Sequence, residues 1–310
     1  MKVIVFDLEW NQAVRGKKDT VKDIPFEIIE IGAVKLNKRK EIIDEFDELV
    51  KPVVYKELHF IIKKMIHIKP LELKNGKLFQ DVVGAFLQWS GRNCTFATWG
   101  PLDLLELQRN MEFYHVKPIA RKPFCFIDVQ KLFSICYEDG HSRRTLAYAV
   151  EYLQIEKTKP FHRALSDAYY TAKVLEQIDN RIIKTYVSYD CYQRPKHKRD
   201  EIKHTYPTYS KYISREYKSR MDAMEDRDVN STRCYLCHRK TEELLPWFST
   251  NGKHYYQVGG CKQHGYIKHK MRIKKTDDNK VFIIKTSKRV PEDVFHELCA
   301  RYQKDKEMIE

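Results

Sequence analysis

Two acidic residues at the end of an apolar segment could hold a metal ion. Asp7 and Glu9 close the segment KVIVFDLE and are separated by one residue. Side chains of a strand alternate between its two faces, so both carboxylates would lie on one face while Leu8 points into the core. Two ionised carboxylates side by side are unfavourable unless a cation lies between them. Taken alone, this pair is also typical of a solvated strand end.

A third carboxylate and a histidine–aspartate pair follow later in the chain. Asp103 comes just after the sequence TWGP at an expected strand-to-helix turn, where the helix dipole by itself favours a carboxylate. His162 and Asp167 lie in the sequence FHRALSDA, five positions apart, and would not share a face of one continuous helix. They could reach the same pocket if His162 lies just before the helix and Asp167 lies one turn inside it. The alternative for His162 is an ordinary loop histidine.

Cysteine and histidine residues in the last third of the chain have the spacing of a metal site. Two pairs, each with two residues between its members, are separated by 23 residues and consist of Cys234, Cys237, Cys261 and His264. Thiolates and imidazole at this spacing predict a closed tetrahedral Zn²⁺ site with a structural role, because four protein ligands leave no open position. His254 or His269 could replace His264, and free cysteines without metal are the alternative.

The charge of the chain is unevenly distributed. The 310 residues carry a net charge of +14, of which residues 1–180 (28 basic, 25 acidic) contribute +3 and residues 181–310 (29 basic, 18 acidic) contribute +11. This asymmetry favours a polyanionic partner, nucleic acid ahead of a membrane surface, although a charged surface that only confers solubility would look the same. No uncharged apolar run reaches the ~18–20 residues of a membrane helix, and the N-terminus is not typical of a secretory signal. We therefore expect a soluble, cytoplasmic protein that does not bind membranes.

The elements that must position the acidic residues alternate between strands and helices. Apolar patterning predicts strands over residues 2–9, 27–37, 41–52, 94–100 and the start of 124–136. Helical spacing occurs over residues 56–67, 79–90, 102–114, 144–153 and 163–178. This order predicts a mixed α/β layer fold for a first domain, residues 1–182.

The rest of the chain is expected to form two further parts. Residues 183–232 lack a regular pattern and carry many Tyr residues among Lys and Arg, which predicts a basic connector whose rings stack on bases or pack on the first domain. Residues 233–310 predict a small, mostly β module with a basic hairpin at 269–289 and a closing helix. A metal ion would help such a small unit to fold. The hairpin lysines suit phosphate contacts, and a solvated edge protected by lysines is the alternative.

The acidic residues and their neighbours resemble the DEDDh family of 3′–5′ exonucleases. FDLEW resembles the first motif of that family, TWGPLDLLELQ the second and HRALSDA the third, and EIIEIGAVKL is similar to its second strand. The resemblance covers roughly residues 1–180. It implies a ribonuclease-H-like fold, in which a mixed sheet is flanked by helices.

The same resemblance implies a role for each residue of the set. Asp7, Glu9, Asp103 and Asp167 would hold two Mg²⁺ or Mn²⁺ ions, for which oxygen ligands are suitable. His162 would act as the general base that takes a proton from the attacking water, since an unperturbed histidine pKa of ~6.5 suits that role near neutral pH. The product would be a nucleoside 5′-monophosphate.

Contacts with the substrate are expected from residues next to these motifs. Many relatives carry Thr directly after the Glu of the first motif, whereas here Trp10 and Asn11 follow. Trp10 could stack on the terminal base or close the core. The candidate contacts are Leu8, Trp10, Asn11 and Trp99 in the first domain and Lys270, Arg272 and Lys274 in the basic hairpin.

These observations predict a metal-dependent 3′–5′ exonuclease that acts on single-stranded nucleic acid. RNA is the preferred substrate because the motifs look more like the RNA-trimming branches of the family than like its proofreading subunits. A DNA exonuclease is the alternative within the same class. A module that binds nucleic acid or protein on an exonuclease scaffold without catalysis is the alternative from another class, and the presence of all five site residues speaks against it.

Overall fold

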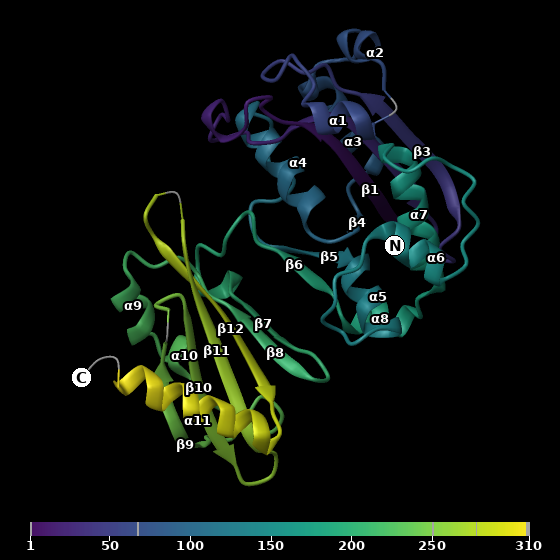
Figure 1. Ribbon diagram of the computed structural model, residues 1–310. Helices are drawn as coiled ribbons and strands as arrows, with labels where there is room; N and C mark the ends of the chain where they lie inside the picture. Colours follow the sequence, from purple (N-terminus) through teal and green to yellow (C-terminus); the bar gives the residue numbers. More distant parts are fainter. Residues whose placement is uncertain (1, 67, 250, 277, 308–310) are drawn as a thin grey trace. The chain divides into compact units, whose positions relative to one another are not determined.

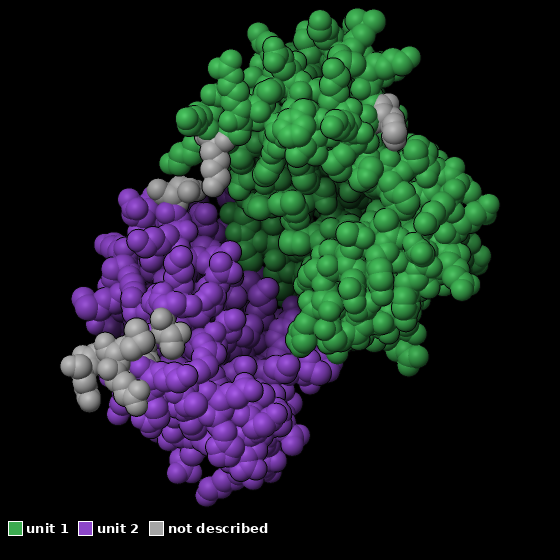
Figure 2. Space-filling model, viewed as in Figure 1, with its two compact units in different colours: residues 1–192 green, residues 193–310 purple. Residues whose placement is uncertain are grey.

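The chain divides after Tyr192 into two units, residues 1–192 and 193–310 (Figure 2). The computed structural model describes residues 2–66, 68–249, 251–276 and 278–307. This division differs from the expected three parts, 1–182, 183–232 and 233–310. The expected connector is not separate, because residues 188–190 pair with the sheet of unit 1 and residues 202–213 supply two strands to the sheet of unit 2.

Unit 1 is built on a mixed six-stranded sheet with the strand order β3-β2-β1-β4-β5-β6 (Figure 1). Its strands are β1 (Lys2–Asn11), β2 (Glu27–Leu36), β3 (Ile42–Leu49), β4 (Cys94–Thr98), β5 (Phe124–Asp128) and β6 (Ser188–Asp190). The first three strands are antiparallel, β4 runs parallel to β1, and β5 runs parallel to β4. Every residue of β2 is buried, as expected of a strand with both faces covered.

Helices cover both faces of this sheet, and each face has its own apolar core. One core packs β1 and β2 against α3 (Phe79–Ser90) and α4 (Leu102–Phe113). The other packs the opposite face against α5 (Val129–Tyr137), α6 (Leu146–Tyr152) and α7 (Ala164–Gln177), and α8 (Asn180–Thr185) follows. The predicted fold class, a mixed sheet flanked by helices followed by a β-rich C-terminal region, is confirmed.

The segment between β3 and α3 holds two short helices in place of the predicted helix over 56–67. They are α1 (Phe60–Met65) and α2 (Pro70–Lys74). The ring of His59 accepts a hydrogen bond from the Ile61 N–H and so fixes the start of α1. Pro70 begins α2, as is common at the first position of a helix.

Unit 2 is a second six-stranded sheet, in which all neighbouring strands are antiparallel and follow the order β7-β8-β12-β11-β10-β9. The strands are β7 (Ile202–Thr205), β8 (Tyr209–Ile213), β9 (Glu242–Phe248), β10 (His254–Cys261), β11 (Gly265–Lys275) and β12 (Val281–Arg289). The short helices α9 (Arg220–Glu225) and α10 (Arg227–Asn230) lie between β8 and β9, and α11 (Glu292–Glu307) follows β12. Across the described ranges of both units, no helix is long and apolar enough to cross a membrane.

Gly32 allows α7 to lie unusually close to β2. A Cβ atom at this position would overlap backbone atoms of Ala164 and Leu165, at the start of α7. Gly32 pairs with Asp7 across the sheet, so this close approach brings the first turn of α7 beside the acidic end of β1.

We predict that Gly32→Ala destabilises the protein, by about 1–3 kcal/mol or more, because backbone atoms cannot move aside as a flexible side chain can. Gly84→Ala is the matched control. Gly84 lies within α3 with nothing close to its Cβ position, so this change should be neutral or stabilising. Chemical denaturation of both variants tests the prediction, and equal effects would contradict it.

Candidate active site

Asp7 and Glu9 extend from the same face of β1. They pair in register with Gly32 and Glu30 of β2, and Leu8 between them is 3% exposed within the core on the opposite face. Alternation along β1 therefore places the two carboxylates on the face opposite Ile4, Phe6 and Leu8.

Asp103 reaches the same end of the sheet from α4. β4 is parallel to β1 and adjacent to it, so the turn after β4 begins α4 next to the end of β1. Asp103 lies in the first turn of this helix and is buried. Although burial raises its pKa, hydrogen bonds from the backbone N–H groups of Asp103 and Leu8 act in the opposite direction. The contact with Leu8 fixes Asp103 beside β1.

His162 and Asp167 approach from the start of α7. Asp167 lies in the first turn of the helix, and its Oδ2 atom accepts a hydrogen bond from the His162 N–H at 3.2 Å. His162 precedes the helix in a left-handed conformation, with φ of 63°, which few non-glycine residues adopt. Its exposed ring, Glu9 and Asp167 each offer one ligand atom within 4.8 Å of the others.

Burial, together with charge repulsion, raises the pKa of all four carboxylates. Burial, and then the charges of Asp103, Asp167 and Glu9, raise the pKa of Asp7 well above its usual range. Burial is also the main cause that raises the pKa of Glu9 to about 8, of Asp103 to about 7 and of Asp167 to about 6. A group of carboxylates of this kind is stable in its ionised form only with cations between them.

The donor set fits divalent metal ions that prefer oxygen ligands. The Oδ1 atom of Asp167 is buried and has no hydrogen-bond partner among the described residues, although its second oxygen has one. An unpaired buried carboxylate oxygen is costly, and a bound cation would remove that cost. Carboxylate oxygens are suitable ligands for Mg²⁺, Ca²⁺ and Mn²⁺.

A buried ion pair, to which the sequence analysis assigned no role, holds the turn that carries His162. Glu30 has no exposure to solvent and accepts two hydrogen bonds at its Oε1 and Oε2 atoms, from Arg163 Nε at 2.8 Å and from the Ala164 N–H at 3.0 Å. Arg163 Nη2 also lies 2.7 Å from Glu30 Oε1 and 3.9 Å from Asp47. Two features of the sequence could have predicted this pair: the charged Glu30 inside the apolar run EIIEIGAV, and Arg163 directly after His162.

Two of the expected substrate contacts are occupied by the protein itself. Leu8 belongs to the core, and the side chain of Asn11 is completely buried. Asn11 donates to the carbonyl groups of Tyr55 and Glu57, at 2.9 and 2.8 Å, and accepts from the His59 N–H at 2.9 Å. The prediction that these two side chains contact the substrate was therefore wrong, and Asn11 instead ties the segment 55–59 to the end of β1.

The two tryptophans are half-buried. Trp10 packs against the core and against the ring of Phe26, with ring centroids 5.8 Å apart. Trp99 donates from Nε1 to the carbonyl of Arg144 at 3.1 Å and packs on Phe133. Both positions stabilise unit 1 while leaving part of each ring accessible.

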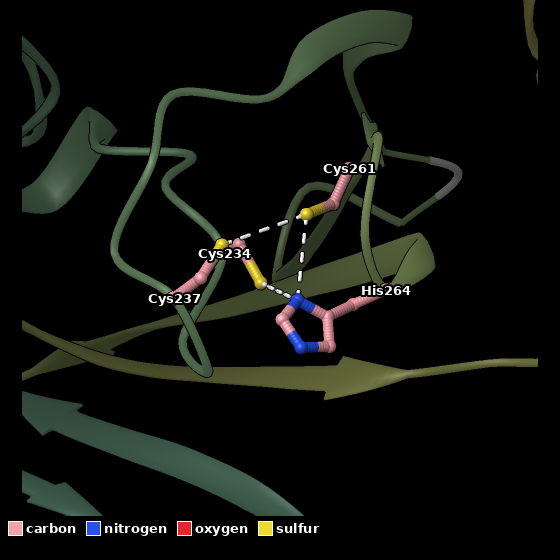
Figure 3. A group of neighbouring side chains, drawn as sticks. All are labelled: Cys234, Cys237, Cys261 and His264. Carbon is pink, nitrogen blue, oxygen red and sulfur yellow. Dashed lines mark hydrogen bonds between the residues drawn. The ribbon is translucent and has the colours of Figure 1, made fainter.

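In unit 2 the four predicted zinc ligands lie together at two tight turns (Figure 3). The Sγ atom of Cys234 is 3.5 Å from His264 Nδ1, Cys261 Sγ is 3.6 Å from the same nitrogen, and the Sγ atoms of Cys237 and Cys261 are 3.7 Å apart. Ligand atoms on a tetrahedron around Zn²⁺, with bonds of about 2.0–2.3 Å, lie about 3.5–3.8 Å apart. The cluster therefore has the size and the donor atoms of a closed zinc site.

The alternative fourth ligands lie elsewhere. His254 has its Nδ1 atom 3.5 Å from the side chain of Asn251. His269 is completely buried, with its Nδ1 atom 2.7 Å from Ser287 Oγ. Of the three histidines, His264 is the one that the fold brings to the cysteines.

The basic residues of the hairpin lie on one face of β11. Lys270, Arg272 and Lys274 alternate with Met271 and Ile273, which pack in the core of unit 2. Arg272 is exposed, and Lys270 lies over the ring of Tyr256 at 5.8 Å. This face of β11 can therefore present positive charge.

Comparison with known proteins agrees with the geometry of unit 1. The chain is 27% identical to the probable 3′-5′ exonuclease KapD of Bacillus subtilis (strain 168) over 181 residues, which cover 57% of this chain and 84% of KapD. It is 29% identical to a PolC-type DNA polymerase III of Caldanaerobacter subterraneus subsp. tengcongensis over 193 residues, which cover 59% of this chain but only 12% of the polymerase.

A solved structure shows the same fold at low sequence identity. The nuclease domain of 3′hExo, a DEDDh family member bound to rAMP, aligns with a TM-score of 0.52 and 19% identity over 60% of this chain and 96% of that domain. The model of the exonuclease family RNase_T matches residues 4–175, which contain all four carboxylates and the histidine described above. Since this match spans more than half of the sequence, the chain belongs to the RNase_T exonuclease family.

Proposed function

We propose that this protein is a metal-dependent 3′–5′ exonuclease that releases nucleoside 5′-monophosphates from single-stranded nucleic acid, with RNA preferred over DNA. The observation that carries the proposal is the group of four carboxylates at the end of β1, of which Asp103 is buried and the other three are half-buried. Among the described residues, one buried oxygen of Asp167 has no hydrogen-bond partner. The similarity to KapD supports the 3′–5′ direction. The similarity to a PolC-type DNA polymerase III favours DNA as the alternative substrate.

In this mechanism Asp7, Glu9, Asp103 and Asp167 hold two divalent metal ions. The ions, when bound, supply a more acidic water and stabilise the leaving 3′ oxygen. His162 accepts a proton at its ring nitrogen when the water oxygen forms a bond to the phosphorus and the bond to the 3′ oxygen breaks. Its position beside Glu9 and Asp167 suits this role, and its exposed ring can pass the proton to solvent.

The Glu30–Arg163 pair positions this base. Arg163 follows His162 directly, and the pair fixes the turn to β2 at the strand position that faces Glu9. A base held by a rigid neighbour loses little freedom on reaching the reactive geometry.

In unit 2, Cys234, Cys237, Cys261 and His264 hold one structural Zn²⁺.

The first prediction concerns activity. A single-stranded RNA labelled at its 5′ end should shorten stepwise from its 3′ end with Mg²⁺ or Mn²⁺, and the matching DNA should shorten more slowly. Asp7→Asn should lower kcat by roughly 10³-fold or more, because metal stabilisation of the transition state is worth several kcal/mol. Glu45→Gln, at an exposed position of β3, is the control. Full activity of Asp7→Asn would contradict the assignment of Asp7 to the active site. Faster shortening of the DNA than of the RNA would reverse the proposed substrate preference.

The second prediction concerns pH and stability without metal. The pKa of Glu9 is 4.5 in the unfolded chain and about 8 in the folded protein, so the folded state binds more protons between these values and loses stability as pH rises. The stability of metal-free Glu9→Gln should therefore increase relative to that of the wild-type protein as pH rises from 4.5 to about 8. Above this range the difference in stability should stay constant. With Mn²⁺ present the wild type should be the more stable protein. Thermal unfolding with and without chelator gives both curves, and parallel pH profiles would contradict the raised pKa of Glu9.

The third prediction concerns zinc. Metal analysis of the purified protein should find about one zinc per chain, and Cys261→Ser should lose it and destabilise unit 2, since a structural zinc contributes directly to folding. Cys299→Ser, a change of the same type on α11 away from the cluster, should retain the metal. A protein without zinc that is unaffected by strong chelators would disprove the site.

A further inference from the structure

We propose that a lysine-lined pocket of unit 1 binds phosphates of the substrate strand on the 5′ side of the cleaved bond. The proposal rests on the exonuclease function above and concerns how that site recognises its substrate. The pocket is about 640 Å³ and is bounded by the segment 51–58 together with α1 and α2. Four of its lining residues are Lys51, Lys56, Lys63 and Lys74, against one acidic residue, Glu57.

The four lysines are available to an anionic ligand. All four are exposed, and among the described residues no ion pair joins any of them to a carboxylate. Other lysines of unit 1, such as Lys35 and Lys77, do have such partners, Asp44 and Glu48. Like charges around one hollow create a positive potential that attracts polyanions.

The pocket is preformed. Leu58 and Leu73 in its lining pack with Ile29 of β2 in a small apolar cluster. The carboxylate of Glu27, itself buried, accepts hydrogen bonds of 2.6–2.9 Å from the N–H groups of Val53, Val54 and Tyr55. Ligand binding therefore needs little ordering of the backbone, which favours affinity.

The pocket lies near the carboxylates. Asn11 follows Glu9 by two strand residues, or about 7 Å. Its side chain donates to the carbonyl of Glu57, a pocket residue, at 2.8 Å. With the length of the Asn side chain included, this path places the pocket wall within roughly 13 Å of the Glu9 backbone. A strand of a few nucleotides can reach both.

The chemistry of the reaction decides which phosphates can bind there. A nucleotide released from the 3′ end carries only the phosphate that is under attack at the metal site. Every other phosphate of the strand lies on the 5′ side, so lysines outside the metal site can engage only the strand that remains. Phe60, the first residue of α1 and 59% exposed, adds a ring on which a base of this strand can stack.

The test compares substrates with one and with many phosphates. In Lys56→Gln/Lys63→Gln, kcat/KM for a dinucleotide with a single phosphodiester, and kcat for a single-stranded 12-mer, should stay at wild-type values. The KM for the 12-mer should rise on the order of 10-fold at moderate salt, and the slope of log kcat/KM against log salt should become shallower by about 0.7 per lysine contact.

The matched control removes the same charge at the other end of β1. Lys2 and Lys38 line a separate hollow of about 580 Å³, and Lys2 begins the strand on which Asp7 and Glu9 come last. Lys2→Gln/Lys38→Gln should keep the wild-type KM and salt slope. An equal effect of both double variants would show that overall charge, and not the pocket, is responsible, and would overturn the proposal.

The remaining outcomes separate this proposal from the function on which it rests. If Lys56→Gln/Lys63→Gln behaves as wild type on the 12-mer, the pocket proposal is wrong while the exonuclease function stands. If the variant loses activity on the dinucleotide to the same degree, the lysines act through the shape of the active site, which also overturns the proposal. If the wild-type protein cleaves neither substrate, the proposed function itself fails.

Discussion

The crowding of four carboxylates at the end of β1 is the constraint on which unit 1 depends. Asp7, Glu9, Asp103 and Asp167 come from three elements. Burial raises the pKa of each, and the charge of Asp167 raises it further at Asp7, Glu9 and Asp103. Such a group would separate unless the rest of the fold held it together. The close approach of α7 to β2 at Gly32 supplies one fixed contact, and the parallel pairing of β1 with β4 supplies the other. The metal-free site therefore stores an unfavourable interaction that cations relieve.

The Glu30–Arg163 pair resists this repulsion next to the site. Glu30 faces Glu9 across the sheet, so without Arg163 it would add a fifth uncompensated charge. Removal of one partner from such a pair destabilises a protein by more than the intact pair stabilises it, because the other charge then remains buried without a partner. The same pair sets the turn in which His162 adopts its left-handed backbone. Stability and the position of His162 are therefore coupled in one contact.

Positive charge has a different basis in the two units. In unit 1, the unpaired lysines of the pocket surround a hollow near the carboxylates and belong to segments that are stapled to β1 and β2 by Asn11 and Glu27. In unit 2, basic residues alternate with core residues along β11, on a sheet whose end is closed by the Cys234–His264 cluster. The first arrangement suits a few phosphates next to the bond that is cleaved, and the second suits a longer stretch of strand.

The sequence by itself predicted most elements of unit 1, apart from β6 and the two short helices that replace the expected helix over 56–67. It also singled out the four carboxylates, because the two-residue period of β1 and the motif order are local properties. The same is true of the cysteine pairs, whose spacing alone predicts two turns that can share one metal ion. Only the tertiary structure decided that the buried Asn11 side chain bonds to the backbone of the segment 55–59 and that Glu30 and Arg163 form an ion pair. It also decided that residues 202–213 join the sheet of unit 2. It also assembled the lysine pocket from three segments. Each of these depends on contacts between residues far apart in the chain, and the identity and spacing of neighbouring residues do not encode which distant partner a polar side chain meets.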